Sequence, residues 1–126
     1  MRNDGLQNIA NANGVESLAC AAAANEASDK FLLANVVKIG ISATINGAGT
    51  VDVLLQLQVS NDGVTFAVET GYSDLLNLVA GTLYTKTIYD SAIPAFKYGR
   101  LLADGQGSNA AGHTLTGTMN LVREDN

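Results

Sequence analysis

Apolar residues fall at every second position over several short stretches of the chain. In the clearest stretch, residues 36–46, one face carries Val37, Ile39, Ile41, Ala43 and Ile45, and the other carries Lys38, Gly40, Ser42 and Thr44. Residues 51–60 alternate in the same way. A period of two is typical of strands that bury one face, so both stretches are predicted to be β-strands. Gly47 and Gly49 are expected to turn the first strand back onto the second, which gives a meander that continues through residue 68.

A Ser-Asn-Asp-Gly turn at residues 60–63 joins the 51–60 strand to a further alternating stretch that contains Val64, Phe66 and Val68. Asn and Asp tolerate left-handed backbone and hydrogen-bond their own main chain, and Gly adopts a positive φ without a steric penalty. We therefore predict a β-hairpin in which the structural turn residues are Asn61, Asp62 and Gly63.

Three more strands are predicted in the second half of the chain. Residues 82–90 are rich in Thr and Tyr, and residues 95–104 follow Pro94, which is tolerated at the start of a strand. The last alternating stretch is residues 114–124. It puts Leu115, Met119 and Leu121 on one face and Thr114, Thr116, Thr118 and Asn120 on the other.

Two segments are less regular. Residues 15–33 fit either structure, because four successive alanines favour a helix while their flanks suit a strand equally well. A strand is the preferred interpretation, and residues 25–29 are then expected to form the turn into the next strand. Residues 73–80 are expected to hold one helical turn that ends at Gly81.

These elements predict an all-β fold. Six to eight short antiparallel strands, separated by turns, are typical of a β-sandwich or a jelly-roll-like arrangement. The chain has 126 residues, which is the size of one domain. Its opening residues 1–14 are polar, rich in Asn and without a period, so they are expected to be an N-terminal arm before a single sandwich domain at residues 15–126.

Charge and hydropathy exclude several classes of partner. Twelve Asp and Glu against seven Lys and Arg give a net charge of −5, which is unfavourable for binding nucleic acid. The apolar stretches are far shorter than the roughly 20 residues that a membrane span requires. Cys20 has no second cysteine to pair with, and the first residues lack the pattern of a signal peptide, so an intracellular product is expected.

The residue types that usually carry chemistry are sparse, and no catalytic, cofactor-binding or metal-binding site is predicted. A Ser-His-Asp relay would require Ser108 and Asp104 to converge on His113, the only histidine, whose expected place is a surface loop. Cys20 lies among alanines and is expected to be a small buried hydrophobe. Asn61 and Asp62 could offer oxygens to Ca²⁺, but that ion prefers six to eight ligands.

The Gly-rich loop at residues 104–112 has the composition of a phosphate-binding loop but not its context. It lies between two predicted strands, and no helix follows to direct its amides at an anion. A surface loop that touches a neighbouring subunit is the better interpretation. Its candidate interface residues are Gln106, Gly107, Ser108, Asn109 and Ala110.

Several motifs occur in a familiar order over residues 35–123: the SNDG turn followed by VTF, the proline-led FKYGRL strand, the Gly-rich loop and the closing strand TLTGTMNLV. In this order the chain resembles the small β-sandwich structural proteins of tailed bacteriophage virions. The same hairpin and strand are also similar to those of discoidin-like carbohydrate-binding sandwiches. The chain departs from the sugar-binding pattern because it has no Trp, and Phe66 stands where a larger aromatic residue often occurs.

The virion resemblance implies a non-enzymatic subunit: a capsid decoration, head fibre or tail-associated protein, found in the virion after synthesis in the host cytoplasm. Its partners would be major capsid or tail proteins and further copies of itself, bound through sheet faces, loops and terminal arms. The alternative is a carbohydrate-binding module for host surface glycans, in which Tyr72, Tyr84, Tyr89 or Tyr98 would stack on the sugar.

Overall fold

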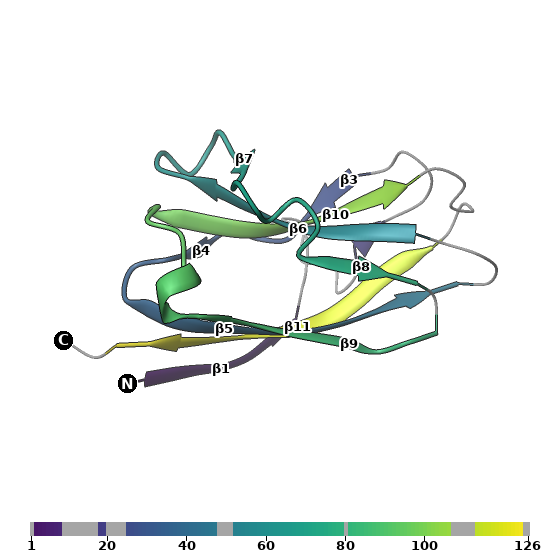
Figure 1. Ribbon diagram of the computed structural model, residues 1–126, viewed down its shortest axis with the longest axis horizontal. Coiled ribbons are helices and arrows are strands. Elements are labelled where there is room, and N and C mark those ends of the chain that lie inside the picture. Colours follow the sequence, from purple (N-terminus) through teal and green to yellow (C-terminus); the bar gives the residue numbers. More distant parts are fainter. Residues whose placement is uncertain are drawn as a thin grey trace.

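A computed structural model of the chain describes residues 2–8, 18–19, 25–47, 52–79, 81–106 and 113–124. These residues form two antiparallel β-sheets stacked face to face (Figure 1). The first sheet runs β1-β11-β5-β9, with β2 also paired to β11, and consists of β1 (Arg2–Asn8), β2 (Leu18–Ala19), β5 (Val36–Asn46), β9 (Tyr84–Tyr89) and β11 (Thr114–Arg123). The second sheet runs β3-β10-β6-β7 and consists of β3 (Asn25–Ala27), β4 (Phe31–Leu32), β6 (Asp52–Ser60), β7 (Ala67–Val68), β8 (Leu76–Leu78) and β10 (Tyr98–Gln106). The predicted all-β sandwich is confirmed.

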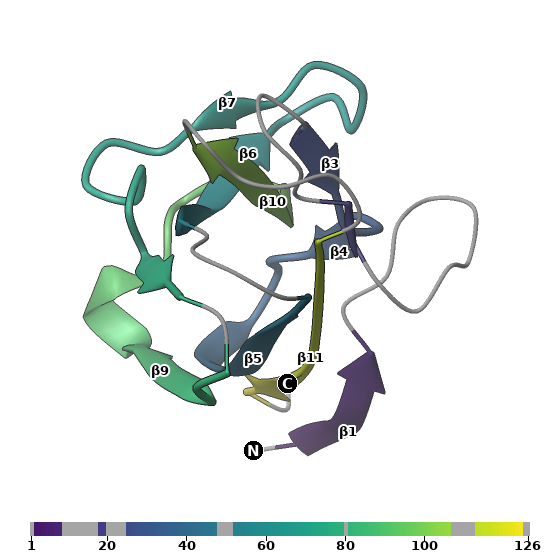
Figure 2. The same cartoon turned by 90° about the vertical axis from the view of Figure 1, so that its right-hand side faces the viewer.

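The order of the strands is that of a jelly roll. In three places, two consecutive strands pair with the same long strand. These are β1 and β2 with β11, β3 and β4 with β10, and β7 and β8 with β6. When each such pair of strands is counted as one position, the described strands fill eight positions, ordered 1-8-3-6 in the first sheet and 2-7-4-5 in the second. Figure 2 shows both sheets almost end on. Viral capsid and lectin domains are among the proteins that use this architecture.

The hydrophobic core lies between the two sheets and follows the alternation in the sequence. Each long strand sends every second side chain inward, where apolar groups are removed from water. The first sheet contributes Leu18, Ile39, Ile41, Ala43, Ile45, Ile88, Leu115, Met119 and Leu121, and the second contributes Phe31, Val53, Leu55, Leu57, Val59, Leu78, Leu101 and Ala103.

The predicted meander is wrong. The strands at 36–46 and 52–60 lie in different sheets, where β5 pairs with β9 and β11, and β6 pairs with β7, β8 and β10. Alternation shows that each strand has one apolar face, but two such strands can bury these faces either side by side or opposite each other. Here they lie opposite each other, so the chain crosses between sheets after Gly47.

Three local predictions also need correction. Residues 73–80 hold no helical turn in their described part; the strand β8 forms there, and both Leu75 and Leu78 reach the core. Residues 25–27 form the strand β3, paired with β10, in place of the expected turn. Val64, expected to alternate into the core, is 81% exposed, because the hairpin's second strand is reduced to the two residues of β7.

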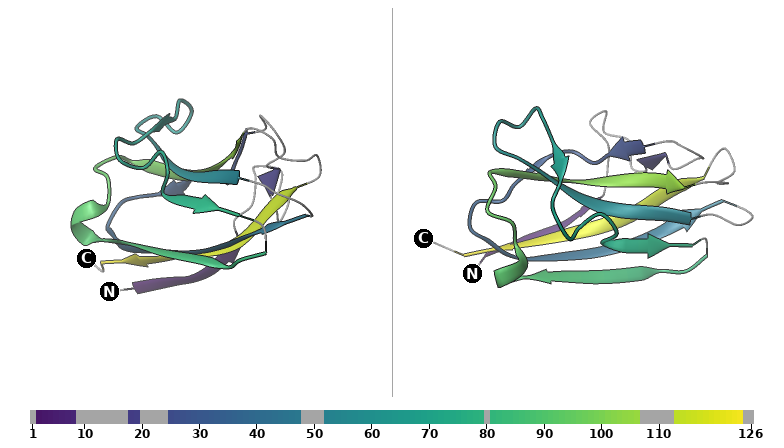
Figure 3. Two further views of the ribbon diagram at one scale, coloured as in Figure 1. Left: turned by 45° about the vertical axis from the view of Figure 1, so that its right-hand side comes forward. Right: turned by 45° about the horizontal axis from the view of Figure 1, so that its top comes forward.

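Part of the predicted N-terminal arm is a strand. Residues 2–8 form β1 along the edge of the first sheet, where Arg2 pairs with Arg123 and Asn8 pairs with Thr118. The remaining residues 9–14 lie outside the described part of the chain. Figure 3 shows β1 beginning beside the end of β11, so the two ends of the described chain lie together.

Helical structure is minimal in the described ranges. The element found there is a single 3-10 turn at Asp90–Ala92. Within those ranges, no helix has the length and apolar character needed to cross a bilayer.

Candidate functional site

The turn after β6 is organised by the carboxylate of Asp62. Its Oδ1 atom accepts hydrogen bonds of 2.8 Å from the Ser60 hydroxyl and from the main-chain N–H groups of Val64 and Thr65. The Ser60 hydroxyl oxygen in turn accepts from the N–H groups of Asp62 and Gly63 at 3.2 and 3.0 Å. Gly63 has φ of 76°, as predicted. Asp62 therefore serves the turn itself, which was the interpretation preferred over a calcium site.

Asn61 has a different role in the same turn. Its Oδ1 atom accepts a hydrogen bond of 3.3 Å from the main-chain N–H of Lys97. This contact ties the turn to the segment that enters β10. Asn61 and Asp62 both keep a negative φ, so the left-handed conformation in this turn is confined to Gly63.

The hydrogen bonds to Asp62 make the turn sensitive to acid. The N–H groups of Val64 and Thr65, followed by the Ser60 hydroxyl, lower the pKa of Asp62 from 3.8 to about 2. Because the folded state holds this pKa below the unfolded value, the stabilisation is complete above about pH 4 and is lost as the pH falls through about 2.

In an NMR titration, we expect the amide shifts of Val64 and Thr65 to move with a midpoint near pH 2. Asp62→Asn, which keeps an acceptor but loses the charge, is the control and should show no such titration. A midpoint close to 3.8 would contradict this role.

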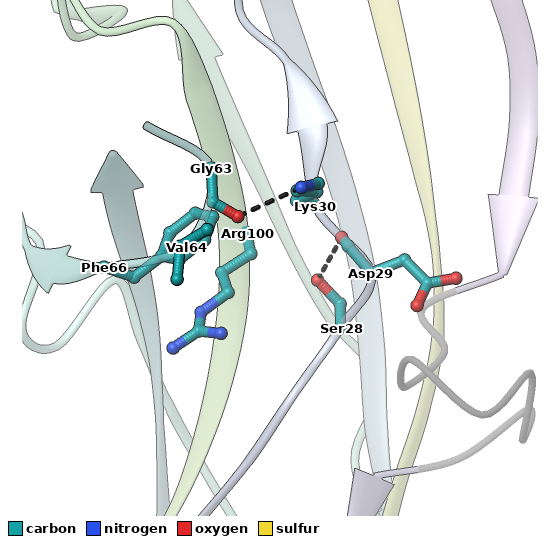
Figure 4. A pocket seen from close by; sticks show the side chains of 7 residues that line it. All are labelled: Ser28, Asp29, Lys30, Gly63, Val64, Phe66 and Arg100. Carbon is teal, nitrogen blue, oxygen red and sulfur yellow. Dashed lines mark hydrogen bonds between the residues drawn. The ribbon is translucent and has the colours of Figure 1, made fainter. Parts of the chain in front are cut away.

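An open pocket of about 510 Å³ lies beside this turn, on the outer side of the second sheet (Figure 4). Its lining comes from three separate segments: Ser28, Asp29 and Lys30 between β3 and β4, then Gly63, Val64 and Phe66 after β6, and Arg100 on β10. The first two segments are joined by a hydrogen bond of 3.0 Å from Lys30 Nζ to the carbonyl oxygen of Gly63.

Gly63 is favoured in this wall by its positive φ, and a side chain there would also be tightly packed. A Cβ atom there would lie 3.1 Å from both Lys30 Nζ and the Cε2 atom of Tyr98. Two cations lie over the ring of Tyr98: Lys30 Nζ is 5.2 Å and Lys97 Nζ is 5.5 Å from its centre. Cation–π contacts of this kind hold the ammonium groups near the pocket.

Arg100 is held in place by two contacts. Its Nε donates to Gln58 Oε1 at 2.7 Å, and its guanidinium carbon lies 4.2 Å from the centre of the Phe66 ring. Partial burial lowers the pKa of Arg100, but a guanidinium stays cationic in proteins. Among the described residues, none accepts a hydrogen bond from its two terminal amino groups. These groups are therefore available to a ligand.

The opposite wall of the pocket is fixed by Ser28. Its hydroxyl donates to the carbonyl oxygen of Asp29 at 3.0 Å and accepts from the N–H of Leu101 at 2.9 Å. The Asp29 side chain is exposed, and in Figure 4 its carboxylate points away from Arg100. Asp29 therefore does not neutralise the guanidinium.

No protein-family model matches this chain, and no curated protein matches it either. The functional argument therefore depends on the fold and on the surfaces described here.

The predicted interface loop is largely outside the described residues. The backbone of Gln106 ends β10 opposite Asp52, and Gly107, Ser108, Asn109 and Ala110 are not among the described residues. Cys20 also lies outside them. The proposed contact of this loop with a neighbouring subunit stays a prediction.

The expectation of a surface histidine is wrong. His113 is 2% exposed, and its ring packs against Gly47, where the chain leaves β5. The residue directly precedes β11, so its neighbourhood is set by the crossing between sheets, which local sequence did not reveal. In the described part of the chain, no three His, Cys, Asp or Glu residues are grouped to hold a metal ion.

The tyrosines do not form a common platform. Tyr72 donates its hydroxyl to the carbonyl oxygen of Ala92, and Tyr84 packs against the core. Tyr89 is exposed on β9 of the first sheet, while Tyr98 lies on β10 of the second. The pocket was missed from the sequence because its lining residues are far apart along the chain. One signal was available in the sequence: Tyr98 and Arg100 are two positions apart in the strand predicted at residues 95–104, so they share a face of that strand.

Proposed function

We propose that the protein is a non-enzymatic structural subunit of a phage virion, a capsid decoration or another capsid- or tail-associated protein. It assembles with major capsid or tail proteins, and with further copies of itself, in the virion. The jelly-roll order is compatible with this role, since viral capsid domains use it, although a fold alone does not assign a function.

The observation that carries the proposal is the outer face of the first sheet. Neighbouring strands present short polar side chains to one another in rows across this face. Thr85, Ser42 and Thr118 form one row, Thr87, Gly40 and Asn120 form the next, and Thr44 pairs with Thr116. Lys38 is the charged side chain in the outward rows of β5, β9 and β11.

A surface of this composition suits close contact with another protein. Short side chains let a second backbone approach, and they lose little rotamer entropy when they are buried. Hydroxyl groups can both donate and accept, so they can satisfy the polar groups of a partner. With few charges to desolvate, such a face can be covered at low energetic cost. Repetition by symmetry would multiply each weak contact.

The edges of the same sheet offer a second means of attachment. The outer edge of β9 is exposed at Thr85, Lys86, Thr87 and Tyr89, and β9 pairs with β5 alone among the described strands. Edge strands can pair with a strand from a neighbouring chain. Leu83, just before β9, is 65% exposed and adds apolar area to this edge.

A charge placed at the centre of this face tests the proposal. Ser42→Arg puts a long cation between Thr118 and Thr85, and we expect at least tenfold weaker self-association or particle binding, because the charge must be desolvated in any contact. Sedimentation of the purified protein, alone and with particles, measures the effect. Thr65→Arg, which adds the same charge on an exposed turn of the second sheet, should assemble as the parent does. Unchanged assembly of Ser42→Arg would rule out this face.

Quantitative mass spectrometry of purified particles tests the location. Copies of this chain in a ratio near one, or one-third, to the major shell protein would identify a capsid decoration, and about one-hundredth would place it at the neck or tail. Absence from particles would overturn the virion proposal.

A further inference from the structure

The pocket beside the Asp62 turn concentrates positive charge on an acidic protein. The chain has a net charge of −5 and seven Lys and Arg. Two of these seven, Lys30 and Arg100, line the pocket, and a third, Lys97, lies over the ring of Tyr98, which Lys30 also approaches. Within the described residues, neither Lys30 nor Arg100 forms an ion pair with a carboxylate. Their contacts described above are to rings, an amide oxygen and a carbonyl oxygen, and none of these groups carries a negative charge.

The geometry points to a binding site for a sugar acid, a saccharide that carries a carboxylate. Arg100 would bind the carboxylate with its two terminal amino groups, assisted by the charge of Lys30. A planar guanidinium matches a carboxylate through two parallel hydrogen bonds, which are stronger than those between neutral groups. The hydrogen bond from Nε to Gln58 and the stacking on Phe66 orient the two terminal amino groups before the ligand binds.

The rest of the pocket matches the remainder of such a ligand. The Asp29 carboxylate points away from Arg100, so it does not occupy the place of the ligand's own carboxylate (Figure 4). Val64 offers apolar surface for the C–H groups of a sugar ring. Cationic donors beside an apolar surface match the carboxylate and the C–H groups of an acidic monosaccharide.

The size of the pocket favours a small molecule over one acidic side chain of a partner protein. Its volume of about 510 Å³ lies within the range of roughly 300–1,000 Å³ that is usual for small-ligand sites. A single Asp or Glu side chain would fill a small part of it. The sugar ring is not expected to stack on Tyr98, because the ammonium groups of Lys30 and Lys97 already lie over that ring.

This inference does not depend on the assembly proposed above, because the pocket lies on the other sheet from Ser42. Experiments can therefore overturn the assembly proposal and the sugar-acid inference independently of each other. If Ser42→Arg loses assembly but binds the sugar acid, the two surfaces act independently, as we expect.

Matched sugars provide the test. Glucuronate and glucose differ in the carboxylate, and both are titrated into the intact protein while amide shifts are followed by NMR. We expect saturable shifts at Gly63, Val64 and Arg100 with glucuronate, and at least tenfold weaker binding of glucose. Equal binding of glucose, or of inorganic phosphate, would overturn the inference. Tighter binding of a Glu-rich peptide than of glucuronate would replace the sugar acid with a protein partner.

Two substitutions locate the site. Arg100→Gln removes the guanidinium and should weaken glucuronate binding at least tenfold. Lys86→Gln, which removes one charge from an exposed position on β9, is the control and should leave binding unchanged. Val64→Glu provides a second variant, because this side chain is 81% exposed and the fold does not depend on it. Its carboxylate would compete for Lys30 and Arg100 and should abolish binding. Full binding by Val64→Glu would place the ligand elsewhere and overturn the inference.

Discussion

Replacing Leu101 with alanine is expected to lower the free energy of unfolding by about 2–5 kcal/mol, the range for removing a large buried side chain. Leu101 is fully buried on β10 and pairs with Leu57 on β6, in the middle of the second sheet. The cavity left between the sheets closes only in part, because the surrounding core side chains are already close-packed and relax little.

The adjacent residue provides the matched control for this change. Leu102 points to the outer face of the same strand and is partly exposed, so Leu102→Ala should have a much smaller effect. Urea denaturation with a common m-value measures both. Equal destabilisation by the two variants would mean that the face assignment of β10 is wrong.

Gly47→Ala is the second substitution for which a large loss of stability is expected. Gly47 has φ of 136°, a conformation that alanine rarely adopts, and the strain alone is of order 1–3 kcal/mol. An added Cβ would also lie 2.2 Å from Cδ2 of His113, so one of the two must move. We expect Gly47→Ala to destabilise the protein by more than the strain alone.

Gly81→Ala separates strain from collision. Gly81 also has a positive φ, 84°, but an added Cβ there would have no atom of the described residues within 4 Å. Thermal or urea unfolding of the two variants should therefore show the larger loss for Gly47→Ala. In a His113→Ala background the penalty of Gly47→Ala should shrink, which a double-mutant cycle measures. Additive effects in that cycle would show that the two residues do not collide.

Alternation along the sequence predicted the strands well but not how they pair. The inward faces of residues 36–46, 51–60 and 114–124 follow from period two, and the buried residues of their described parts confirm them with one exception. Val37 was predicted to point inward, but Val36 is the buried residue, because the register of β5 and β11 shifts there. Period two carries no information on whether two amphipathic strands share a sheet or face each other. That choice depends on the crossings of the jelly roll, and both the false meander and the misplaced His113 follow from it.

The Asp62 turn could be predicted from local sequence, whereas the pocket depends on how the strands pair. The hydrogen bonds of Asp62 reach residues at most three positions away, so the Ser-Asn-Asp-Gly motif was enough to predict them. The pocket combines Lys30, Gly63 and Arg100, which come together only when β4, β6 and β10 have been placed in one sheet. No local pattern encodes such a site.

The strand order also determines how the protein can fold. In the first sheet Asn46 pairs with Thr114, 68 positions later, and β1 pairs with the end of β11. A growing chain therefore cannot complete this sheet until β11 has been synthesised, and pairing over such long separations is slow because each loop must be closed first. The β6–β7 hairpin is a local exception, since Gln58 pairs with Val68 across the turn. The Asp62 turn is thus an expected early step in folding, formed before the sheets can associate.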